Sequence, residues 1–480
     1  MNEYKLYLAG EWAETKSGKI VDDINPATGG LFAKVHTAGP EEIEKALAAA
    51  EAAQPAWAAL LPEEREAVLL RAADYLAANM ERMCTELIEE TGSCFMKAMG
   101  ELAECVNVFR TAAGECRRVD GGVVPADIQG QLSFYVRLPV GVVLGIGPFN
   151  YPFLLSLNKV ALALAAGNAM ILKPASDSPR SGLLIAECLD AAGLPKGLFS
   201  VLPGPGGTVG DALVRDPRIK MIAFTGSTQA GSEIAVKAAQ HGKRCALEMG
   251  GKNPIIVLND ADLEKAATIA LFGAYFHQGQ ICMATSRVIV EDGVYDKFSE
   301  IFEAKVRALR CGDPHSPETI IGPLIRESQC AVLDEHIRDA CEKGAKLVCG
   351  GTHKGAFYAP SLLADVTPDM KVFHEESFGP LTSLIRAKDA EDALRLCNLN
   401  TYGLSAAICT QDVSKAMSYA MRMEAGMVHI NDSTVMGSRR APFGGVKASG
   451  IGREDSSFSV EEFTVCRWIT LQYGERGYPV

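Results

Sequence analysis

The sequence lacks a continuous apolar segment long enough to cross a membrane. A helical span needs about 20 consecutive apolar residues, and no run in the 480 residues approaches that length. The first residues, Met1 to Trp12, are polar and mixed in charge, so they do not resemble a secretory signal. We therefore expect no membrane partner and predict a cytoplasmic protein.

An excess of positive charge is also missing. The 59 acidic residues outnumber the 47 Lys and Arg residues, which gives a formal net charge of −12. A chain of this charge repels polyanions, so nucleic acid is not expected as a partner.

Cysteine spacing typical of metal sites is absent. The 14 cysteines are scattered from Cys84 to Cys466, with no CxxC pair and no Cys/His cluster at zinc spacing. In a chain of this length without a signal peptide they indicate reduced thiols, most of them buried as small apolar residues. We expect no metal and no disulfide scaffold, and at most one or two reactive cysteines.

What is present is an ordinary globular composition, with 48% hydrophobic and 22% charged residues in a chain long enough for two or three compact units. Residues 39–53 predict a helix, capped by Gly39 and opened by Pro40, and further helical pattern runs to about residue 119. Residues 129–139 predict a strand that could form half of a hairpin.

From Val140 onward strands and helices alternate. We predict strands at 140–146, 169–172, 198–202 and 221–224, with helices at 152–166, 178–192 and 230–240 between and after them. This alternation predicts an α/β fold with a parallel, doubly wound sheet. Ligands bind beyond the carboxyl ends of such strands, so Asn150, Lys173 and Gly226–Ser227 should share one rim.

A second run of alternation starts after Gly250 and Gly251, with a strand at 254–258 and a helix at 262–276. We therefore place a domain boundary near Gly251. The predicted units are a Rossmann-type cofactor domain (1–117 and 140–250), a second α/β catalytic domain (251–447) and a small β element for bridging or oligomerisation (118–139 and 463–480). The strand-like tail at 463–472 could pair with the early hairpin or with another subunit.

Two glycine-rich segments could bind a dinucleotide. In the LPGPGGTVG segment, Val209 stands where a G-x-G-x-x-G fingerprint needs its third glycine. The FTGSTQAG segment follows a strand and opens a helix, where N–H groups and the Ser227 hydroxyl could hold a phosphate. An ordinary strand-to-helix turn explains that segment equally well.

Three polar residues lie where they could carry chemistry. Cys282 follows a helix and a glycine, where a loop could expose a nucleophile. Glu248 ends an apolar strand beside two glycines, and desolvation there would raise its pKa toward that of a general base. Asn150 ends a strand-turn and could donate to an oxyanion. Each alone is also explained as a buried thiol, a capping carboxyl or a turn residue.

Taken together, the motifs resemble the aldehyde dehydrogenase superfamily, from the NPATG segment at 25–29 to GIGR at 450–453. They occur in the family's order: GPFNYP at 147–152, ILKPAS at 171–176, FTGST at 224–228, LEMGGKNP at 247–254, GQICMATSR at 279–287, EESFGP at 375–380, HIND at 429–432 and PFGGVKASGIGRE at 442–454. So many motifs at compatible spacings cover nearly the whole chain.

The resemblance implies a role for each matching residue. Cys282 matches the nucleophile that forms a thioester, Glu248 the general base and Asn150 the oxyanion-holding amide, helped by the Cys282 N–H. It implies NAD or NADP as cofactor, bound without a G-x-G-x-x-G fingerprint, and Lys159 matches a lysine near it. The implied cofactor contacts are Phe149, Lys173, Ser176, Gly226, Ser227, Glu376 and Phe378.

Ser176 departs from strictly NAD-using members, which usually carry a glutamate at this position. A carboxylate there would repel a 2′-phosphate, whereas serine removes the repulsion and Lys173 could meet the phosphate. We therefore predict that NADP is tolerated and even preferred. The alternative is that Asp177 or a loop shift restores a preference for NAD.

The substrate mouth should be apolar, which favours an apolar or aromatic aldehyde. Its expected residues are Tyr151, Leu155, Asn158, Ile281, Met283, Val435 and Met436. The amino-acid sequence around GPFN at 147–150 and that of the C-terminal tail resemble the benzaldehyde and vanillin dehydrogenase branch. However, Arg439 and Arg440 depart from that branch and could instead bind an anionic semialdehyde, unless they face solvent or another subunit. For His277 we expect packing rather than catalysis.

Three other functions are compatible with the sequence. CoA-acylating members generally lack the base that Glu248 matches, so its presence favours water as the acceptor. A binding protein that lost catalysis is a further possibility, as is a cysteine hydrolase that needs no dinucleotide. By resemblance, the strands at about 118–139 and 463–480 imply a homodimer or homotetramer.

Overall fold

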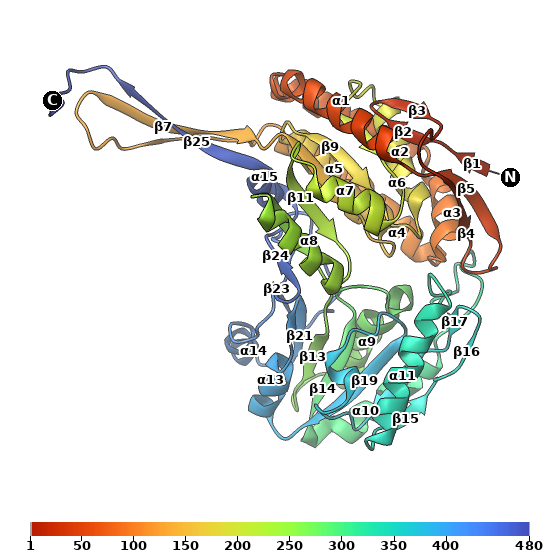
Figure 1. Cartoon of the computed structure of the whole chain (residues 1–480). Helices are drawn as coiled ribbons and strands as arrows, with labels where there is room; N and C mark the ends of the chain where they lie inside the picture. The colour runs from red at the N-terminus through yellow and green to blue at the C-terminus, as the bar shows by residue number, and fades with distance from the viewer. Residues whose placement is uncertain (1, 480) are drawn as a thin grey trace.

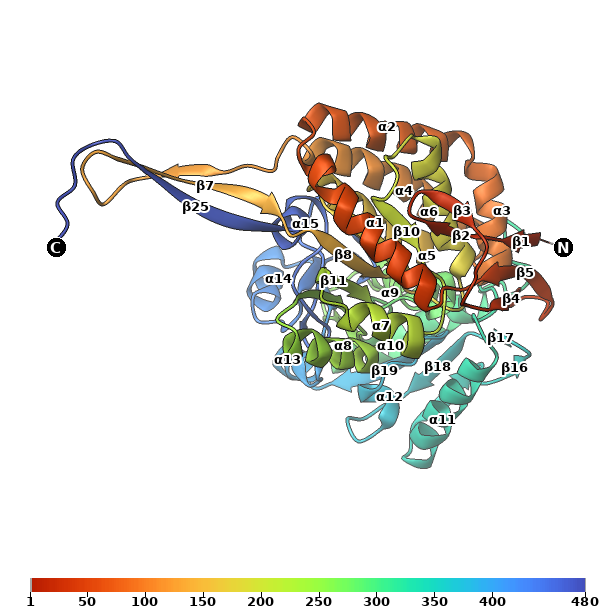
Figure 2. The same cartoon turned by 45° about the horizontal axis from the view of Figure 1, so that its top comes forward.

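A computed structural model describes residues 2–479 of the chain, which leaves Met1 and Val480, the outer ends of two predicted ranges, outside the description. Two bodies built on large sheets lie one above the other, and a thin β arm projects from their side (Figure 1). After a turn of the molecule the arm still extends well beyond both bodies (Figure 2).

The first body is built on an eight-stranded sheet in the order β24-β12-β11-β8-β9-β10-β2-β3. Its five central strands are parallel: β8 (Val142–Ile146), β9 (Ala169–Lys173), β10 (Phe199–Val201), β11 (Ile219–Thr225) and β12 (Arg244–Glu248). The strand order reverses between β8 and β11, and ligands bind at such a switch point. Short antiparallel strands flank this core: β2 (Leu6–Leu8), β3 (Glu11–Ala13) and β24 (Gly450–Ile451).

The helices of this body agree with the predicted alternation. They are α1 (Pro40–Ala58), α2 (Pro62–Ala78), α3 (Met80–Thr91), α4 (Phe95–Glu115), α5 (Pro152–Ala165), α6 (Pro179–Ala191), α7 (Asp211–Arg215) and α8 (Thr228–Gln240). Helix α1 begins at the predicted Pro40 but continues through Pro55 to Ala58. Tertiary packing explains the extension, because Trp57 is buried and its indole N–H donates to Leu164 O at 2.8 Å.

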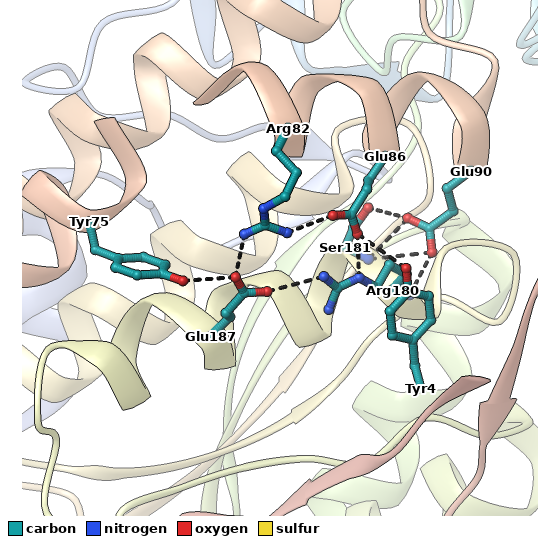
Figure 3. Close-up of polar contacts among 8 residues, drawn as sticks. All are labelled: Tyr4, Tyr75, Arg82, Glu86, Glu90, Arg180, Ser181 and Glu187. Atoms are coloured by element: carbon teal, nitrogen blue, oxygen red, sulfur yellow. Dashed lines mark hydrogen bonds and ion pairs between the residues drawn. The ribbon is translucent and has the colours of Figure 1, made fainter. Parts of the chain in front are cut away.

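An ion-pair network ties α3 to the start of α6, the helix that follows β9 and Ser176 (Figure 3). The Arg180 guanidinium bonds Glu86 at 2.6 Å and Glu187 at 3.1 Å. Glu90 accepts hydrogen bonds from the backbone N–H groups of Arg180 and Ser181. A carboxylate at a helix N-terminus is favoured by the helix dipole, so the loop that carries Ser176 leads into a firmly anchored helix.

The second body contains a seven-stranded sheet in the order β15-β18-β19-β14-β13-β21-β22. All its neighbouring strands are parallel except β15, which runs antiparallel to β18. The strands are β13 (Asn253–Val257), β14 (Thr285–Glu291), β15 (Lys346–Cys349), β18 (Ser361–Ala364), β19 (Leu381–Ala387), β21 (Ser405–Cys409) and β22 (Met427–Ile430). Its helices are α9 (Leu263–Tyr275), α10 (Asp292–Arg307), α11 (Ser328–Glu342), α12 (Lys371–His374), α13 (Ala390–Asn398) and α14 (Val413–Ala420).

The arm is a three-stranded antiparallel sheet of β6 (Gly122–Val124), β7 (Gln131–Pro139) and β25 (Thr464–Gln472). β25 pairs with β7 along nine residues, from Thr464 opposite Pro139 to Gln472 opposite Gln131. Of the two pairings expected for the tail, the structure shows the one with the early hairpin. Helix α15 (Ser456–Glu462) leads into β25.

The remaining strands form small sheets. They are β1 (Asn2–Tyr4), β4 (Ile20–Ile24) and β5 (Leu31–His36), and the pairs β16 (His353–Lys354) with β17 (Phe357–Tyr358) and β20 (Tyr402–Gly403) with β23 (Val446–Lys447). Across residues 2–479, no helix has the length and apolar character needed to cross a membrane.

The two large sheets present opposite ends to each other. The first contributes the carboxyl ends of β8, β9, β11 and β12, which lead to Asn150, Lys173, Ser227 and Glu248. The second contributes the loops before β14 and β19, which carry Cys282 and Glu376. The chain changes sheet between Glu248 and Asn253, close to the predicted boundary near Gly251, although the predicted domain limits stay a prediction.

Candidate active site

Cys282 lies in a tight turn that leads into β14. Ala284 N–H donates to Ile281 O at 2.9 Å, which closes the turn. Asn253 Nδ2 donates to the carbonyl oxygens of Cys282 (2.8 Å) and Ala284 (3.0 Å), and Thr434 Oγ1 donates to Met283 O (2.7 Å). The backbone on both sides of the sulfur is therefore held by Asn253, at the start of β13, and by Thr434, in the loop that follows β22.

The Cys282 thiol is half-buried between acidic groups. Burial, followed by the Glu376 and Glu248 carboxyls, raises the pKa of Cys282 to about 12, whereas the Met283 and Cys282 N–H groups favour the thiolate. In this structure the surroundings of Cys282 therefore favour the thiol over the thiolate.

Glu248 ends β12 and is buried, and neither carboxylate oxygen has a hydrogen-bond partner among residues 2–479. Burial and then Glu454 raise the pKa of Glu248 well above its usual range, against the lowering effect of Lys159 and Arg453. The expected desolvation is present, and an unpaired carboxyl of this kind is suited to taking up a proton.

A buried ion pair lies beside Glu248. Lys159 Nζ is 2.7 Å from Glu454 Oε1 and donates to Thr225 Oγ1 at 2.6 Å. Glu454, within the GIGRE motif, is a site residue that the sequence analysis did not single out. The motif could have indicated it, because a glutamate at the end of a glycine-rich apolar segment needs a partner when buried.

Asn150 is buried at the end of the turn that follows β8. Its amide Nδ2 donates to Gln280 O at 2.9 Å, two residues before Cys282. An amide carries two N–H groups, so this bond orients the group and leaves a second donor. The structure thus brings Asn150, Cys282 and Glu248 together where the strand ends of the first sheet face the loops before β14 and β19 of the second. This region is called the seam below.

A buried ion pair in α4, also missed from the sequence, supports Asn150. Lys97 Nζ is 2.5 Å from Glu101 Oε2 and donates to Asn150 O at 2.6 Å. Glu101 Oε1 accepts the N–H groups of Phe153 and Leu154, both at 3.0 Å. No sequence signal indicates this, because pairs of Lys and Glu four residues apart usually face solvent.

Several of the expected cofactor contacts line the same seam. Glu376 Oε1 accepts the Gly251 N–H at 3.1 Å, and the Phe149 and Phe378 rings meet edge-on with centroids 5.6 Å apart. Gly250 permits this approach, because a Cβ there would lie 2.6 Å from Glu376 Oε2. Burial raises the pKa of Glu376 to about 7.

Lys173 and Ser176 lie at the end of β9. Lys173 Nζ donates to Pro174 O at 2.9 Å, and burial lowers the pKa of Lys173 to about 8. Ser176 is exposed and donates to Gly204 O at 3.3 Å. The neighbouring Asp177 is engaged by Arg326 at 2.7 Å, and this arginine also lies over the Phe149 ring at 5.9 Å.

Ser227 caps α8, and its hydroxyl oxygen accepts the Ala230 N–H at 3.3 Å. The Gly226 N–H donates to Glu248 O at 3.1 Å, so it is already occupied. A phosphate contact at this turn would therefore come from Ser227 and the first turn of α8 rather than from the Gly226 N–H. The contact itself stays a prediction.

The expected mouth residues surround the thiol only in part. Tyr151 lies close enough for the Cys282 sulfur to help raise its pKa, and its ring packs edge-on against His277 at 5.5 Å. His277 is buried with φ +52°, and burial lowers its pKa well below 6.5, which agrees with packing. Ile281 instead faces a small cavity shared with Glu376 and Phe378. Leu155 is buried, Met283 is half-buried and Met436 is exposed.

An open cavity of about 810 Å³ lies between α4, α15 and the loop at 438–440. Arg439 lines it but is paired with Asp455 at 3.2 Å and faces Glu104 at 3.9 Å. Arg440 is exposed and lines the same cavity, as does Arg110, and neither forms an ion pair within the described part of the chain. The two neighbouring arginines thus have different environments.

Comparison with known proteins decides the family. Residues 12–469 match the aldehyde dehydrogenase family. The chain belongs to the aldehyde dehydrogenase family. It is 41% identical to a vanillin dehydrogenase of Pseudomonas fluorescens over 483 residues, which cover 100% of both chains.

Solved structures agree with this assignment. One is a salicylaldehyde dehydrogenase from Pseudomonas putida G7 complexed with salicylaldehyde, with a TM-score of 0.98 and 37% identity over 100% of both chains. Another is an NADP-dependent glyceraldehyde-3-phosphate dehydrogenase from Bacillus halodurans C-125 complexed with NADP, with a TM-score of 0.95 and 37% identity over 99% of this chain and 100% of that one. The predicted fold and the predicted enzyme class, an NAD(P)-dependent aldehyde dehydrogenase that forms a carboxylic acid, are confirmed.

The raised pKa of Cys282 in this aldehyde dehydrogenase leads to a prediction. In the cofactor-free enzyme, alkylation of Cys282 by iodoacetamide should rise about tenfold per pH unit between pH 8 and pH 10, because a pKa of about 12 leaves the thiolate fraction far from saturation. Peptide-resolved mass spectrometry separates Cys282 from the exposed Cys311, Cys341 and Cys466. A plateau reached below pH 9 would contradict the burial argument.

Proposed function

We propose that the protein oxidises an aromatic aldehyde to its carboxylic acid through a thioester on Cys282. The supporting observation is that the Cys282 thiol lies within electrostatic reach of two carboxyls, Glu248 and Glu376. These carboxyls come from different sheets and have different surroundings. One thiol with a hydrolytic base and a cofactor-holding group beside it is what aldehyde oxidation to an acid requires.

Acylation begins when the Cys282 thiol releases its proton to water and the resulting thiolate sulfur attacks the aldehyde carbon. The carbonyl π electrons move to the oxygen, which becomes an oxyanion. Asn150 Nδ2, oriented by Gln280 O at 2.9 Å, and the Cys282 N–H are the donors proposed to hold that oxygen. A well-placed donor of this kind contributes about 3 kcal/mol to barrier lowering.

The residues at the seam fit a nicotinamide dinucleotide. Ser227 opens α8 with a positive helix end for the pyrophosphate, Glu376 offers a carboxylate for ribose hydroxyls, and Phe149 and Phe378 form an aromatic corner. When bound, the cofactor supplies the acceptor for the hydride released from the acylating carbon. Cys282 then carries the acyl group as a thioester.

Deacylation uses water and Glu248. The carboxylate takes a proton from water, the resulting hydroxide attacks the thioester carbon, and the C–S bond breaks to return the Cys282 thiolate and release the acid. Glu248 suits this step because its oxygens have no hydrogen-bond partner in the described part of the chain and burial raises its pKa, which makes it a stronger base than an exposed carboxylate. The adjacent Lys159–Glu454 pair is placed to balance its charge.

The division of labour between Cys282 and Glu248 can be tested kinetically. Glu248→Gln should keep a rapid burst of NAD(P)H of about one equivalent per site and lose steady turnover by about 100-fold or more, because general-base catalysis typically contributes 10²–10⁴-fold. Stopped-flow absorbance measures both phases. Cys282→Ala should abolish the burst as well. Equal loss of burst and turnover in Glu248→Gln would contradict a role confined to deacylation.

An aromatic substrate is supported by the names of the relatives, a vanillin dehydrogenase and a salicylaldehyde dehydrogenase complexed with its aldehyde. The Tyr151 ring, close to the sulfur, adds an aromatic wall. A second candidate is a semialdehyde with an anionic tail. Arg440 and Arg110, both lining the 810 Å³ cavity, favour it, whereas the pairing of Arg439 with Asp455 removes one of the two arginines expected to bind the tail.

A panel of aldehydes distinguishes an aromatic substrate from an anionic semialdehyde. We expect kcat/KM for benzaldehyde to exceed that for succinic semialdehyde by about 10-fold or more, since a mismatched charged tail in an apolar site costs at least about 1.4 kcal/mol. Arg440→Ala should leave the benzaldehyde value within about twofold. A preference for succinic semialdehyde that Arg440→Ala abolishes would replace the first candidate with the second.

For the cofactor, we propose that NADP is accepted at least as well as NAD. Ser176 carries no charge, and the nearby Asp177 is engaged by Arg326 at 2.7 Å, so neither residue presents a free carboxylate to a 2′-phosphate. Lys173 supplies a cation at the end of β9, three residues before Ser176.

Introducing a carboxylate tests this preference. Ser176→Glu should lower the ratio of kcat/KM for NADP to that for NAD by about 10-fold or more, because it adds charge repulsion close to the 2′ position. Ser176→Gln is the matched control of equal size, and it should shift the ratio far less. If the wild type already rejects NADP, or if both variants shift the ratio alike, the charge argument fails.

We also propose that the arm mediates self-association into a dimer or tetramer. It projects from the body (Figure 2) and exposes large apolar side chains, with Trp468 70%, Val123 75% and Leu471 56% accessible. Apolar surface of this kind marks interaction sites. A cytoplasmic location remains a proposal, supported by the free state of all 14 cysteines.

A further inference from the structure

The loop that carries Glu376 and Phe378 is held by buried polar side chains, His336 from α11 and Lys252 from the segment just before β13. His336 Nδ1 is 3.0 Å from Ser377 Oγ, and Lys252 Nζ donates to the same oxygen at 3.2 Å. His336 Nε2 is 3.3 Å from Glu375 Oε2. His336, Ser377 and Lys252 are each at most 3% exposed. Ser377 thus lies between the two expected cofactor contacts and between two buried nitrogen groups.

The protonation states of these groups determine which atom donates and which accepts in each hydrogen bond. Burial, with Lys252 nearby, lowers the pKa of His336 to about 4, so the ring is neutral and carries one N–H. A carboxylate can only accept, so that proton lies on Nε2 and points to Glu375. Nδ1 must then accept, which makes the Ser377 hydroxyl the donor to His336. The remaining lone pairs of Ser377 Oγ are thereby directed to Lys252.

Lys252 depends on this acceptor. Ser377 Oγ is the one hydrogen-bond partner of its ammonium in the described part of the chain. Burial, followed by the buried Arg287, lowers the pKa of Lys252 to about 7, whereas Glu376 and Glu375 favour its ammonium form. In the other direction, Lys252 favours the charged form of Glu376 against the effect of burial. The protonation state of Glu376 is therefore linked, through Lys252, to the hydrogen bond between Ser377 and His336.

We propose that His336 is a positioning residue for cofactor binding, which holds the Lys252 ammonium beside Glu376 through Ser377 and so keeps Glu376 a carboxylate ready to accept ribose hydroxyls. This inference rests on the proposed function, in which Glu376 contacts the nicotinamide ribose. The effect of His336 is confined to the nicotinamide half of the cofactor, because these hydrogen bonds reach the loop at 375–378 and not Lys173 or Ser227.

Two substitutions separate the nitrogens of the ring. His336→Gln places an amide near the position of Nε2 and keeps the contact with Glu375, but it removes the acceptor for Ser377. His336→Asn places its carboxamide oxygen near the position of Nδ1 and keeps that acceptor, but it loses Glu375. The two variants remove the same ring and differ in which bond survives.

Calorimetric titration with NAD⁺, NADP⁺ and ADP tests the proposal, because ADP carries the adenosine and both phosphates but no nicotinamide ribose. His336→Gln should weaken binding of the dinucleotides by about 10-fold, since it removes one hydrogen bond in a chain that ends on a charged group, and should leave ADP within about twofold. His336→Asn should restore dinucleotide affinity to within about threefold of the wild type.

Equal weakening by His336→Gln and His336→Asn, or an equal loss of ADP affinity, would overturn the proposal in favour of a general packing role. Ser377→Ala provides a second route should His336→Gln fail to fold. It should show the same selective loss, with Ser377→Thr as the control that retains the hydroxyl, and wild-type affinity in Ser377→Ala would overturn the proposal.

Glu376→Gln separates this inference from the proposed function. If Glu376→Gln weakens dinucleotide binding and His336→Gln does not, the positioning role is refuted and the contact of Glu376 with the ribose survives. If Glu376→Gln itself binds dinucleotides and ADP as the wild type does, the proposed role of Glu376 is wrong, and the role of His336 is refuted with it.

Discussion

Two acidic side chains removed from water beside one thiol form the arrangement on which the rest of the structure depends. Placing a carboxyl in a desolvated site without a hydrogen-bond partner is costly, yet Glu248 is held in this way next to Cys282. Such a group favours its neutral form and takes up a proton readily. The same surroundings favour the Cys282 thiol over the thiolate. Both the nucleophile and the base are therefore held in their neutral forms until the electrostatic surroundings at the seam change.

The scaffold keeps these groups in place by anchoring their backbones. Asn253 and Thr434 hold the carbonyls around Cys282, and the Lys97–Glu101 pair holds the backbone of Asn150 and the start of α5. Because the first sheet presents carboxyl ends of strands and the second presents the loops before its strands, groups from both meet at one seam. A buried ion pair adds little net stability, but Lys97 and Glu101 satisfy backbone groups that would otherwise be unpaired next to the chemistry.

The sequence predicted the alternating sheets well and the polar support poorly. Strands β8, β9 and β11 were found within about two residues at each end, because short apolar segments bounded by glycines are strong signals. Helix α1 ran five residues past its predicted end because Trp57 packs into the core. Glu248, Cys282 and Asn150 were indicated by their motifs, whereas Lys97, Glu101 and His336 were not. Their partners lie far away in sequence, and a lone Lys, Glu or His in a helix looks like a surface residue.

In the proposed reaction Cys282 carries the acyl group of the oxidised aldehyde, and Glu248 directs its release. The most direct measurement is the mass of the Cys282 peptide, taken from the Glu248→Gln enzyme quenched in acid during reaction with benzaldehyde and NADP⁺. We expect this peptide to gain the mass of one benzoyl group in nearly every molecule, while the wild type shows little of it. A benzoyl group on another cysteine, or none on the Cys282 peptide while acid is still formed, would show that Cys282 is not the acyl carrier.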